Sequence, residues 1–316
     1  MDKKIVILGT GGTIAGTGAA GGHAYVAAQL GVEALVQAVP GLQQAAGMAL
    51  QAEQLAQLDS KDMDHATWVR LARRCAALLA DDQVAGIVVT HGTDTLEESA
   101  WLLHELLPAD KPVVLTCAMR PATALLADGP QNLLDAVLLA AHPQARGVLV
   151  CALGTVHGAR EVSKLHPQRL DAFASLDSGP LGWVEAGQLR WAHGVPPAAG
   201  TPRHGALLQA RAFGQTPWPR VEIALSHAGC DGALLDWMVA GGVRGIVVAA
   251  TGNGTLHQAL RPALLRAVDA GVRVRIAARC PLGRMAATAG QPWRDAEGLS
   301  PVKARISLML ELMEEA

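Results

Sequence analysis

The chain carries little charge, and neither sign is in marked excess. Asp, Glu, Lys and Arg make up 17% of its 316 residues, and 26 basic against 28 acidic side chains give a formal net charge of −2. The two signs are interspersed, so the sequence has neither the basic stripe of a nucleic-acid-binding protein nor an acidic tail. We therefore expect a small-molecule partner and no binding to nucleic acid.

Paired cysteine motifs are also missing. The 5 cysteines are widely spaced and none belongs to a C-x-x-C pair. This spacing argues against both a disulfide framework and a zinc knuckle. We expect buried free thiols and no metal site at these positions, which are Cys75, Cys117, Cys151, Cys230 and Cys280.

Long apolar runs are absent too. No stretch reaches the run of about 18 apolar residues that a membrane span needs. The sequence starts MDKKIVILGTGG, whose apolar run is too short for the central region of a signal peptide. We expect a cytoplasmic protein that makes no contact with a membrane.

The first glycine-rich turn does not match a nucleotide-binding loop. It follows Ile5–Leu8, a continuous apolar run that predicts a buried strand. A dinucleotide fingerprint needs a further glycine where the chain has Ile14, and a phosphate loop needs a Gly-Lys pair that is missing. The turn instead presents Thr13 beyond the end of a strand, where open α/β sheets place their ligands. A threonine here could equally cap a helix or close a turn.

Apolar runs alternate with helical stretches along most of the chain. VAGIVVTHG precedes EESAWLLHELL, and KPVVLTCAM precedes GPQNLLDAVLLAAH. This alternation predicts an α/β fold with a larger, doubly wound, mainly parallel sheet in an N-terminal domain. Periodicity is lost and proline and glycine accumulate after residue 189. We expect a catalytic domain at 1–189, a linker at 190–212 and a smaller C-terminal α/β domain at 213–316.

Residues 15–24, AGTGAAGGHA, are almost all glycine, alanine or small polar residues. Such a segment cannot pack firmly, and we predict a mobile lid. It leads to Tyr25, the only tyrosine in the chain. The tyrosine either anchors the lid or brings a hydroxyl to a closing site.

Two further polar stretches lie near predicted strand ends. VVTHGTDTLEE holds Thr93 and Asp94, which could also cap the following helix, and GTVHGAREVSK holds Lys164, which could also be a solvated surface charge. A threonine hydroxyl needs a base to become a good nucleophile, and a lysine in its neutral form can serve. Asp94 would orient that lysine. Together with Thr13, these residues predict acyl transfer with oxyanion stabilisation by glycine-rich backbone.

The order and spacing of five segments resemble the bacterial-type L-asparaginase and glutaminase-asparaginase family over nearly the whole chain. The segments are TGGTIAG, THGTDTLEE, AMRP, DGPQNLLDAV and HGAREVSK. The resemblance implies a two-domain α/β amidohydrolase without metal or cofactor. It also implies that L-asparagine is hydrolysed to L-aspartate and ammonia through a threonyl acyl-enzyme.

The resemblance assigns catalytic roles position by position. Thr13 matches the nucleophile, and Tyr25 matches the lid tyrosine that helps to activate it. Thr93, Asp94 and Lys164 match a second group, in which the lysine is the base. Both threonines would then lie around the scissile carbonyl.

The same comparison assigns substrate contacts and assembly. Asp59 and Ser60, in LDSKDM, match the segment that grips the substrate α-carboxylate, and Asp94 would also bind the α-ammonium. Ala118 matches a backbone position near the leaving amide. The family implies a homotetramer of close dimers, in which the smaller domain of a neighbouring subunit completes each site.

Two departures from the family pattern fall in the smaller domain. Thr255 stands where relatives have asparagine or serine, and RMAATAG after Gly283 lacks a carboxylate that some relatives supply to the ammonium pocket. Selectivity between asparagine and glutamine therefore stays open, with a mixed glutaminase-asparaginase as the alternative. A binding protein without catalysis is disfavoured because Thr13 and Lys164 are both present. The ammonia-releasing subunit of archaeal tRNA amidotransferase is disfavoured by the balanced charge and the lack of an added N-terminal domain.

Overall fold

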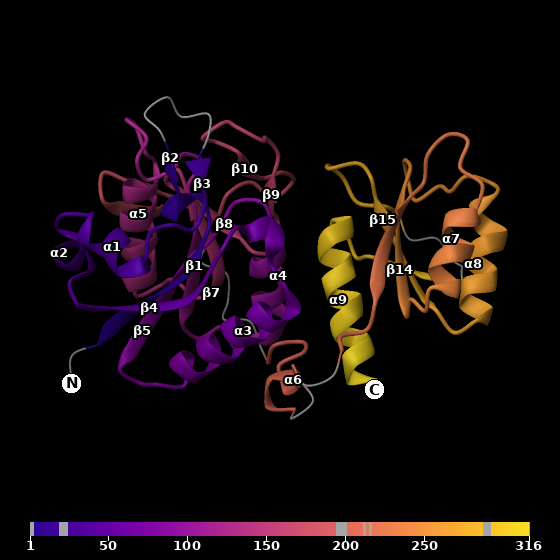
Figure 1. Ribbon diagram of the computed structural model, residues 1–316, viewed down its shortest axis with the longest axis horizontal. Helices are drawn as coiled ribbons and strands as arrows, with labels where there is room; N and C mark the ends of the chain where they lie inside the picture. Colours follow the sequence, from indigo (N-terminus) through magenta and orange to yellow (C-terminus); the bar gives the residue numbers. More distant parts are fainter. Residues whose placement is uncertain are drawn as a thin grey trace. The chain divides into compact units, whose positions relative to one another are not determined.

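The computed structural model describes residues 3–18, 25–193, 201–210, 213–214, 217–286 and 292–315. The chain divides into two compact units, Met1–Ala210 and Arg211–Ala316 (Figure 1). Each unit has a sheet of its own, which confirms the expected α/β class with a larger N-terminal and a smaller C-terminal sheet. Six of the predicted lid residues, 19–24, lie outside the described residues.

The N-terminal unit is built on an eight-stranded sheet in the order β12-β11-β8-β7-β6-β5-β1-β4. Five of its strands run parallel: β1 (Lys4–Gly11), β4 (Ala49–Leu58), β5 (Val84–Thr90), β6 (Pro112–Thr116) and β7 (Gly147–Ala152). The other three strands pair in antiparallel fashion: β8 (Thr155–Gly158), β11 (Gly182–Glu185) and β12 (Gln188–Trp191). The buried strand predicted at Ile5–Leu8 is the centre of β1, and its four side chains have no exposed surface. A parallel strand covered on both faces requires such a continuous apolar run.

Helices cover both faces of this sheet (Figure 1). On one face, α1 (Val32–Gln37), α2 (Leu42–Ala46) and α5 (Gly129–Ala141) share a core with the strands, in which Ile5 and Ile7 meet Leu35 and Val137. On the other, α3 (His65–Leu79) packs on β5 and α4 (Leu96–Leu106) packs on β7. Asp64 caps the start of α3, and its carboxylate accepts a 2.7 Å hydrogen bond from the Thr67 amide.

Short elements surround the carboxyl ends of the parallel strands. They are η1 (Thr13–Ala15), β2 (Thr17–Gly18), β3 (Tyr25–Val26), η2 (Ser60–Asp62), β9 (Val162–Lys164) and β10 (Phe173–Ser175). The β2 and β3 strands pair with each other, as do β9 and β10.

Part of the expected linker is ordered structure. Arg190 and Trp191 end β12, paired with Trp183 and Gly182 of β11. The Arg190 guanidinium lies 4.3 Å from the centre of the Trp183 ring and forms an ion pair with Glu185. These contacts extend the β11–β12 hairpin past residue 189. Further along, α6 (Ala206–Gln209) packs against α3 and α4.

The C-terminal unit is a four-stranded parallel sheet in the order β13-β14-β15-β16. Its strands are β13 (Val221–Leu225), β14 (Gly245–Ala250), β15 (Arg273–Ala278) and β16 (Arg294–Asp295). The helices α7 (Ala233–Ala240) and α8 (Leu260–Asp269) share a core with one face, and α9 (Pro301–Glu314) packs on the strands as well. Within the described part of the chain, no helix is both long and apolar enough to cross a membrane.

Candidate active site

Four loops of the N-terminal unit meet at one edge of its sheet. The strands β4, β1, β5 and β6 are neighbours and run parallel, so their carboxyl ends lie at the same edge. The residues that follow these strands include Ser60, Thr13, Thr93 and Ala118 in the same order. Sequence-predicted site residues from four separate segments therefore share this edge.

Contact between two glycines brings the β1 and β5 loops together. A β-carbon built on Gly12 would lie closer than 3.0 Å to the Cα of Gly92, and the φ of Gly12 is +82°. A β-carbon on Gly92 would lie 2.7 Å from the Cβ of Ser60. Only glycine permits such close approach, and the two glycines directly precede Thr13 and Thr93.

Thr13 opens η1 and is 7% exposed. The cap residue of η1 is Gly12, and no side chain caps this helix, so Thr13 does not fill the capping role. Its hydroxyl instead lies 2.8 Å from the Tyr25 hydroxyl. Tyr25 reaches it from β3, in register with Gly18 of β2. The structure thus pairs the predicted nucleophile with the predicted lid tyrosine.

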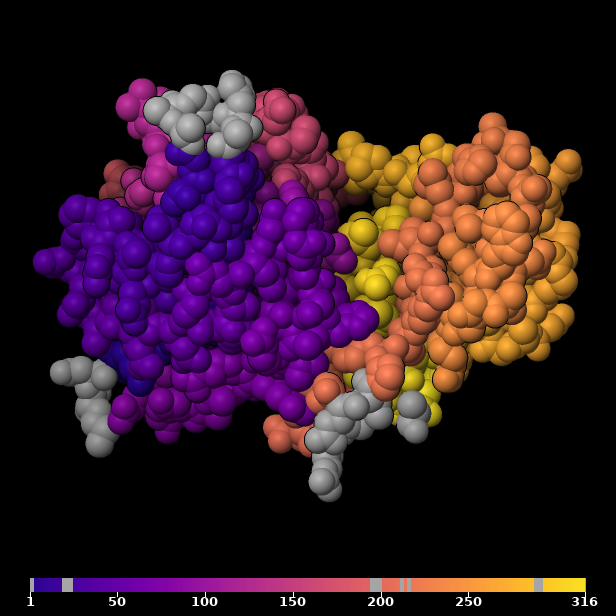
Figure 2. Space-filling view, in the orientation of Figure 1, coloured from indigo at the N-terminus to yellow at the C-terminus, as the bar shows by residue number. Residues whose placement is uncertain are grey.

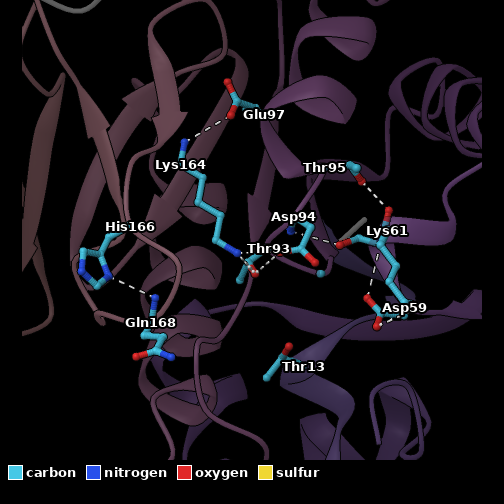
Figure 3. A network of polar contacts seen from close by, with 12 residues as sticks. Thr13, Asp59, Lys61, Thr93, Asp94, Thr95, Glu97, Lys164, His166 and Gln168 are labelled. Carbon is cyan, nitrogen blue, oxygen red and sulfur yellow. Dashed lines mark hydrogen bonds and ion pairs between the residues drawn. The ribbon is translucent and has the colours of Figure 1, made fainter. Parts of the chain in front are cut away.

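Thr93, Asp94 and Lys164 form a second group (Figure 3). The Lys164 ammonium donates to Thr93 Oγ1 over 2.7 Å and to Asp94 Oδ1 over 2.6 Å. The Lys164 side chain is 15% exposed and that of Asp94 is 52% exposed. Lys164 is therefore held inside the site and is not a solvated surface charge, while the Asp94 carboxylate remains open to solvent on one side.

Ser60 is buried between the β4 and β5 loops. Its Oγ accepts from the Asp94 amide over 3.1 Å, and its carbonyl accepts from Thr95 Oγ1 over 2.7 Å. Because the Ser60 hydroxyl accepts the amide hydrogen, it can still donate its own hydrogen to a carboxylate. Asp59 caps η2 by accepting from the Lys61 amide, and its carboxylate lies 3.5 Å from the Lys61 ammonium.

The Ala118 loop is fixed from the start of α5. The Asp128 carboxylate accepts from the amides of Met119 and Arg120, each over 2.9 Å. Asn132 donates to the Cys117 carbonyl over 2.9 Å. Ala118 is buried, with its flanking residues both held, so its backbone is well defined. The polar residues of DGPQNLL therefore have a structural task that their sequence pattern did not reveal.

A buried chain of hydrogen bonds supports the loop before Thr93. His91 Nδ1 lies 2.7 Å from the Gly92 carbonyl, which only accepts, so Nδ1 carries the hydrogen and Nε2 accepts from Ser99 Oγ over 2.9 Å. Ser99 in turn accepts from Trp68 Nε1 over 2.8 Å. Burial lowers the pKa of His91 to about 4, so its ring is neutral at neutral pH.

The two departures lie in the C-terminal unit. Thr255 is exposed, and its hydroxyl donates to the Thr251 carbonyl over 3.0 Å. Of the segment after Gly283, residues 284–286 are described and 287–290 lie outside the described residues. Among the described side chains, no group of three His, Cys, Asp or Glu is placed to hold a metal ion.

Comparison with family models covers both units. The model described as "Asparaginase, N-terminal" matches residues 4–196, and the "Glutaminase/Asparaginase C-terminal domain" matches residues 220–315. The chain belongs to the asparaginase family. This membership confirms the resemblance carried by the five sequence segments.

Individual members of the asparaginase family align over nearly the whole chain. The glutaminase-asparaginase of Pseudomonas fluorescens biotype A is 37% identical over 98% of this chain and 86% of its own length. L-asparaginase 2 of Escherichia coli is 37% identical over 98% of this chain and 89% of its own. The crystal structure of a probable cytoplasmic L-asparaginase from Campylobacter jejuni has a TM-score of 0.89 and 36% identity, and covers 99% of this chain and 95% of that one.

Proposed function

We propose that the chain is an L-asparaginase, which hydrolyses L-asparagine to L-aspartate and ammonia through a threonyl acyl-enzyme. One observation carries this proposal most directly. Two buried threonines at the same sheet edge each have an activating partner, Tyr25 at 2.8 Å from Thr13 and Lys164 at 2.7 Å from Thr93. Two activated hydroxyls on facing loops suit a reaction that first forms and then breaks an ester.

In the first half-reaction, Thr13 Oγ1 bonds to the side-chain amide carbon of asparagine and loses its proton toward Tyr25. The carbon–nitrogen bond then breaks as the Tyr25 hydroxyl passes this proton on to the nitrogen, which leaves as ammonia. In the second half-reaction, water adds to the ester carbon and passes a proton by way of Thr93 Oγ1 to the neutral amine of Lys164. Asp94, 2.6 Å from Lys164, stabilises the ammonium that results. The bond between that carbon and Thr13 Oγ1 then breaks, Thr13 Oγ1 takes up the proton that Lys164 had accepted, and L-aspartate leaves.

Substrate recognition uses the loops around these two groups. Ser60 donates its hydroxyl hydrogen to the α-carboxylate, and Asp59 contributes by capping the turn that presents Ser60. The half-exposed carboxylate of Asp94 binds the α-ammonium. The backbone at Ala118 lies near the leaving amide. Together, Ser60 and Asp94 hold the substrate at a fixed distance from Thr13.

A direct test measures ammonia release from L-asparagine, L-glutamine and D-asparagine side by side. One methylene distinguishes two substrates by about 1–3 kcal/mol, so kcat/KM for L-asparagine should exceed that for L-glutamine by at least about tenfold. No ammonia from any amide would contradict the enzyme assignment. Equal or greater efficiency with L-glutamine would favour a mixed glutaminase-asparaginase, the name carried by the Pseudomonas relative.

We also propose a homotetramer of close dimers. Apolar side chains lie exposed on α7 and α8, namely Trp237 at 72%, Leu234 at 49% and Leu265 at 38% exposure. These helices cover one face of the C-terminal sheet and belong to the orange surface in Figure 2. Large exposed apolar groups are common where copies of a chain associate. Light scattering of the purified protein should give four times the mass of 32.8 kDa. A monomeric mass would overturn this proposal.

A cytoplasmic location fits the thiol chemistry. All 5 cysteines are free, as expected for a reducing compartment. The expected burial holds for Cys75, Cys117 and Cys151, but it is wrong for Cys280, which is exposed, and Cys230 is only half-buried. Fractionation of cells that express the chain should recover the activity with the cytoplasmic marker. Recovery with a periplasmic marker would show that the location is wrong.

A further inference from the structure

Glu97 holds the strand that carries Lys164. Glu97 lies in the first turn of α4, and its two carboxylate oxygens contact adjacent residues of β9. Oε1 accepts from the Lys164 backbone amide over 3.2 Å (Figure 3). Oε2 accepts from Ser163 Oγ over 3.1 Å.

Glu97 contacts the edge of β9 that does not face β10. On its other edge β9 pairs with β10, where Lys164 lies opposite Phe173 and the Leu165 amide donates to the Ala172 carbonyl. The Lys164 amide points away from that ladder and donates to Glu97 instead. A two-stranded sheet of such short strands is only marginally stable by itself, so the two bonds from Glu97 help to fix where β9 lies.

The same helix start also fixes the partners of Lys164. Thr93 and Asp94 lie in the loop that leads directly into α4, which begins at Leu96. Glu97 therefore connects Lys164 to the same helix start that positions its two partners, the Thr93 hydroxyl and the Asp94 carboxylate. The start of α4 thus holds Thr93 and Asp94 through the chain and Lys164 through Glu97.

We propose that Glu97 is a positioning residue for the amine of Lys164. This proposal rests on the proposed function, in which Lys164 is the base. A displacement of about 1 Å in a catalytic group can cost about a hundredfold in rate. Without Glu97, the Lys164 amide and the Ser163 hydroxyl would form hydrogen bonds with water, and β9 would no longer be held beside the start of α4.

The experiment compares Glu97→Ala, Glu97→Gln and Ser163→Ala by steady-state kinetics with L-asparagine. Glu97→Ala should lower kcat by about 10- to 100-fold. KM should not rise, because Ser60 and Asp94 still bind the substrate and a slower second half-reaction lowers KM together with kcat. Glutamine can accept from the Lys164 amide and donate to the Ser163 hydroxyl, so Glu97→Gln should stay within about fivefold of wild type. Ser163→Ala, which removes one of the two bonds, should lie between them.

A matched control separates positioning from general helix effects. Glu98→Ala removes the same charge from the same turn of α4, and should leave kcat within about twofold. Urea unfolding of each variant shows that the protein assayed is folded. An equal loss of kcat in Glu98→Ala and Glu97→Ala, or an unchanged kcat in Glu97→Ala, would overturn the proposal.

A double-mutant cycle distinguishes failure of this proposal from failure of the mechanism. In the Lys164→Met background, Glu97→Ala should change the residual turnover by less than about twofold, because there is no amine left to position. The same fold-loss in both backgrounds would mean that Glu97 acts through something other than Lys164. Near-normal turnover of Lys164→Met alone would instead contradict the role of the lysine as base.

Discussion

Gly12 and Gly92 meet backbone to backbone at the carboxyl ends of β1 and β5. Besides its close approach to the Gly92 Cα, a β-carbon on Gly12 would lie 2.8 Å from the carbonyl carbon of His91. The neighbouring backbone cannot move aside without shifting Thr93, since His91 is locked by Ser99 and by the Gly92 carbonyl. The absence of side chains at these two positions therefore sets the separation between the two threonine loops.

Gly12→Ala should consequently disturb both loops at once. Left-handed backbone alone costs an alanine about 1–2 kcal/mol, and the clash with backbone adds to this cost. Gly187→Ala is a matched control, because Gly187 has a φ of +77° but a β-carbon there meets nothing within 4 Å. Urea unfolding should show a loss at least about 2 kcal/mol larger for Gly12→Ala than for the control. Equal losses would mean that the loops have room to adjust.

Thr13→Val tests the nucleophile. Valine keeps the shape of the threonine side chain but removes the hydroxyl, so turnover should fall by at least about a thousandfold while the fold survives. Thr13→Ser keeps a hydroxyl at the same position and should retain far more activity than Thr13→Val. Retention of more than about a tenth of wild-type turnover by Thr13→Val would show that the threonyl mechanism is wrong.

The fold and the edge that holds the candidate site were predictable because their signals are local. Continuous apolar runs marked the buried strands, and hydroxyl-bearing residues just beyond them marked the edge where parallel strands end. These signals alone place Thr13 and Thr93 at the same edge of the sheet. The motif resemblance then supplied roles for Tyr25 and Lys164 that no local pattern carries.

The supporting contacts could not be predicted, because they join residues far apart in sequence. Glu97 reaches Lys164 across 67 positions, and Thr123 reaches Gly18 across 105. Nothing in the local pattern around a glutamate or a threonine says which distant strand will pass beside it. Arg190 and Trp191 fall inside the predicted linker for a different reason: proline and glycine accumulate just after them, and this local signal hides their pairing with the preceding strand.

Thr123 should influence turnover through Tyr25. Its hydroxyl donates to the Gly18 carbonyl over 3.0 Å and accepts from the Gly18 amide over 2.9 Å, and Gly18 pairs with Tyr25. Thr123→Val removes both bonds and should lower kcat by about three- to tenfold, with less than about 1 kcal/mol change in stability because the bonds are exposed. Thr123→Ser keeps the hydroxyl and should restore kcat. Identical kinetics for the two variants would exclude this role.

Acid should destabilise the protein through its buried neutral histidines. Burial lowers the pKa of His157 to about 4, as it does for His91, from an ordinary value of 6.5. The unfolded chain takes up a proton at each ring below pH 6.5, whereas the folded protein does not until about pH 4. Stability is therefore fully present above pH 6.5 and falls as pH drops toward 4, by up to about 3 kcal/mol per histidine.

His157→Asn isolates one of these histidines. Asparagine can keep the 3.0 Å hydrogen bond that links His157 Nδ1 to Ser175 Oγ. Among the described residues His157 Nε2 has no hydrogen-bond partner that the substitution would remove. Urea unfolding of variant and wild type at several pH values between about 7.5 and 5 gives the difference in unfolding free energy, in which all other titrating groups cancel. This difference should move in favour of the variant as pH falls, by about 1.4 kcal/mol for each pH unit below the ordinary histidine pKa. A difference that stays constant with pH would mean that His157 takes up its proton equally in the folded and unfolded states.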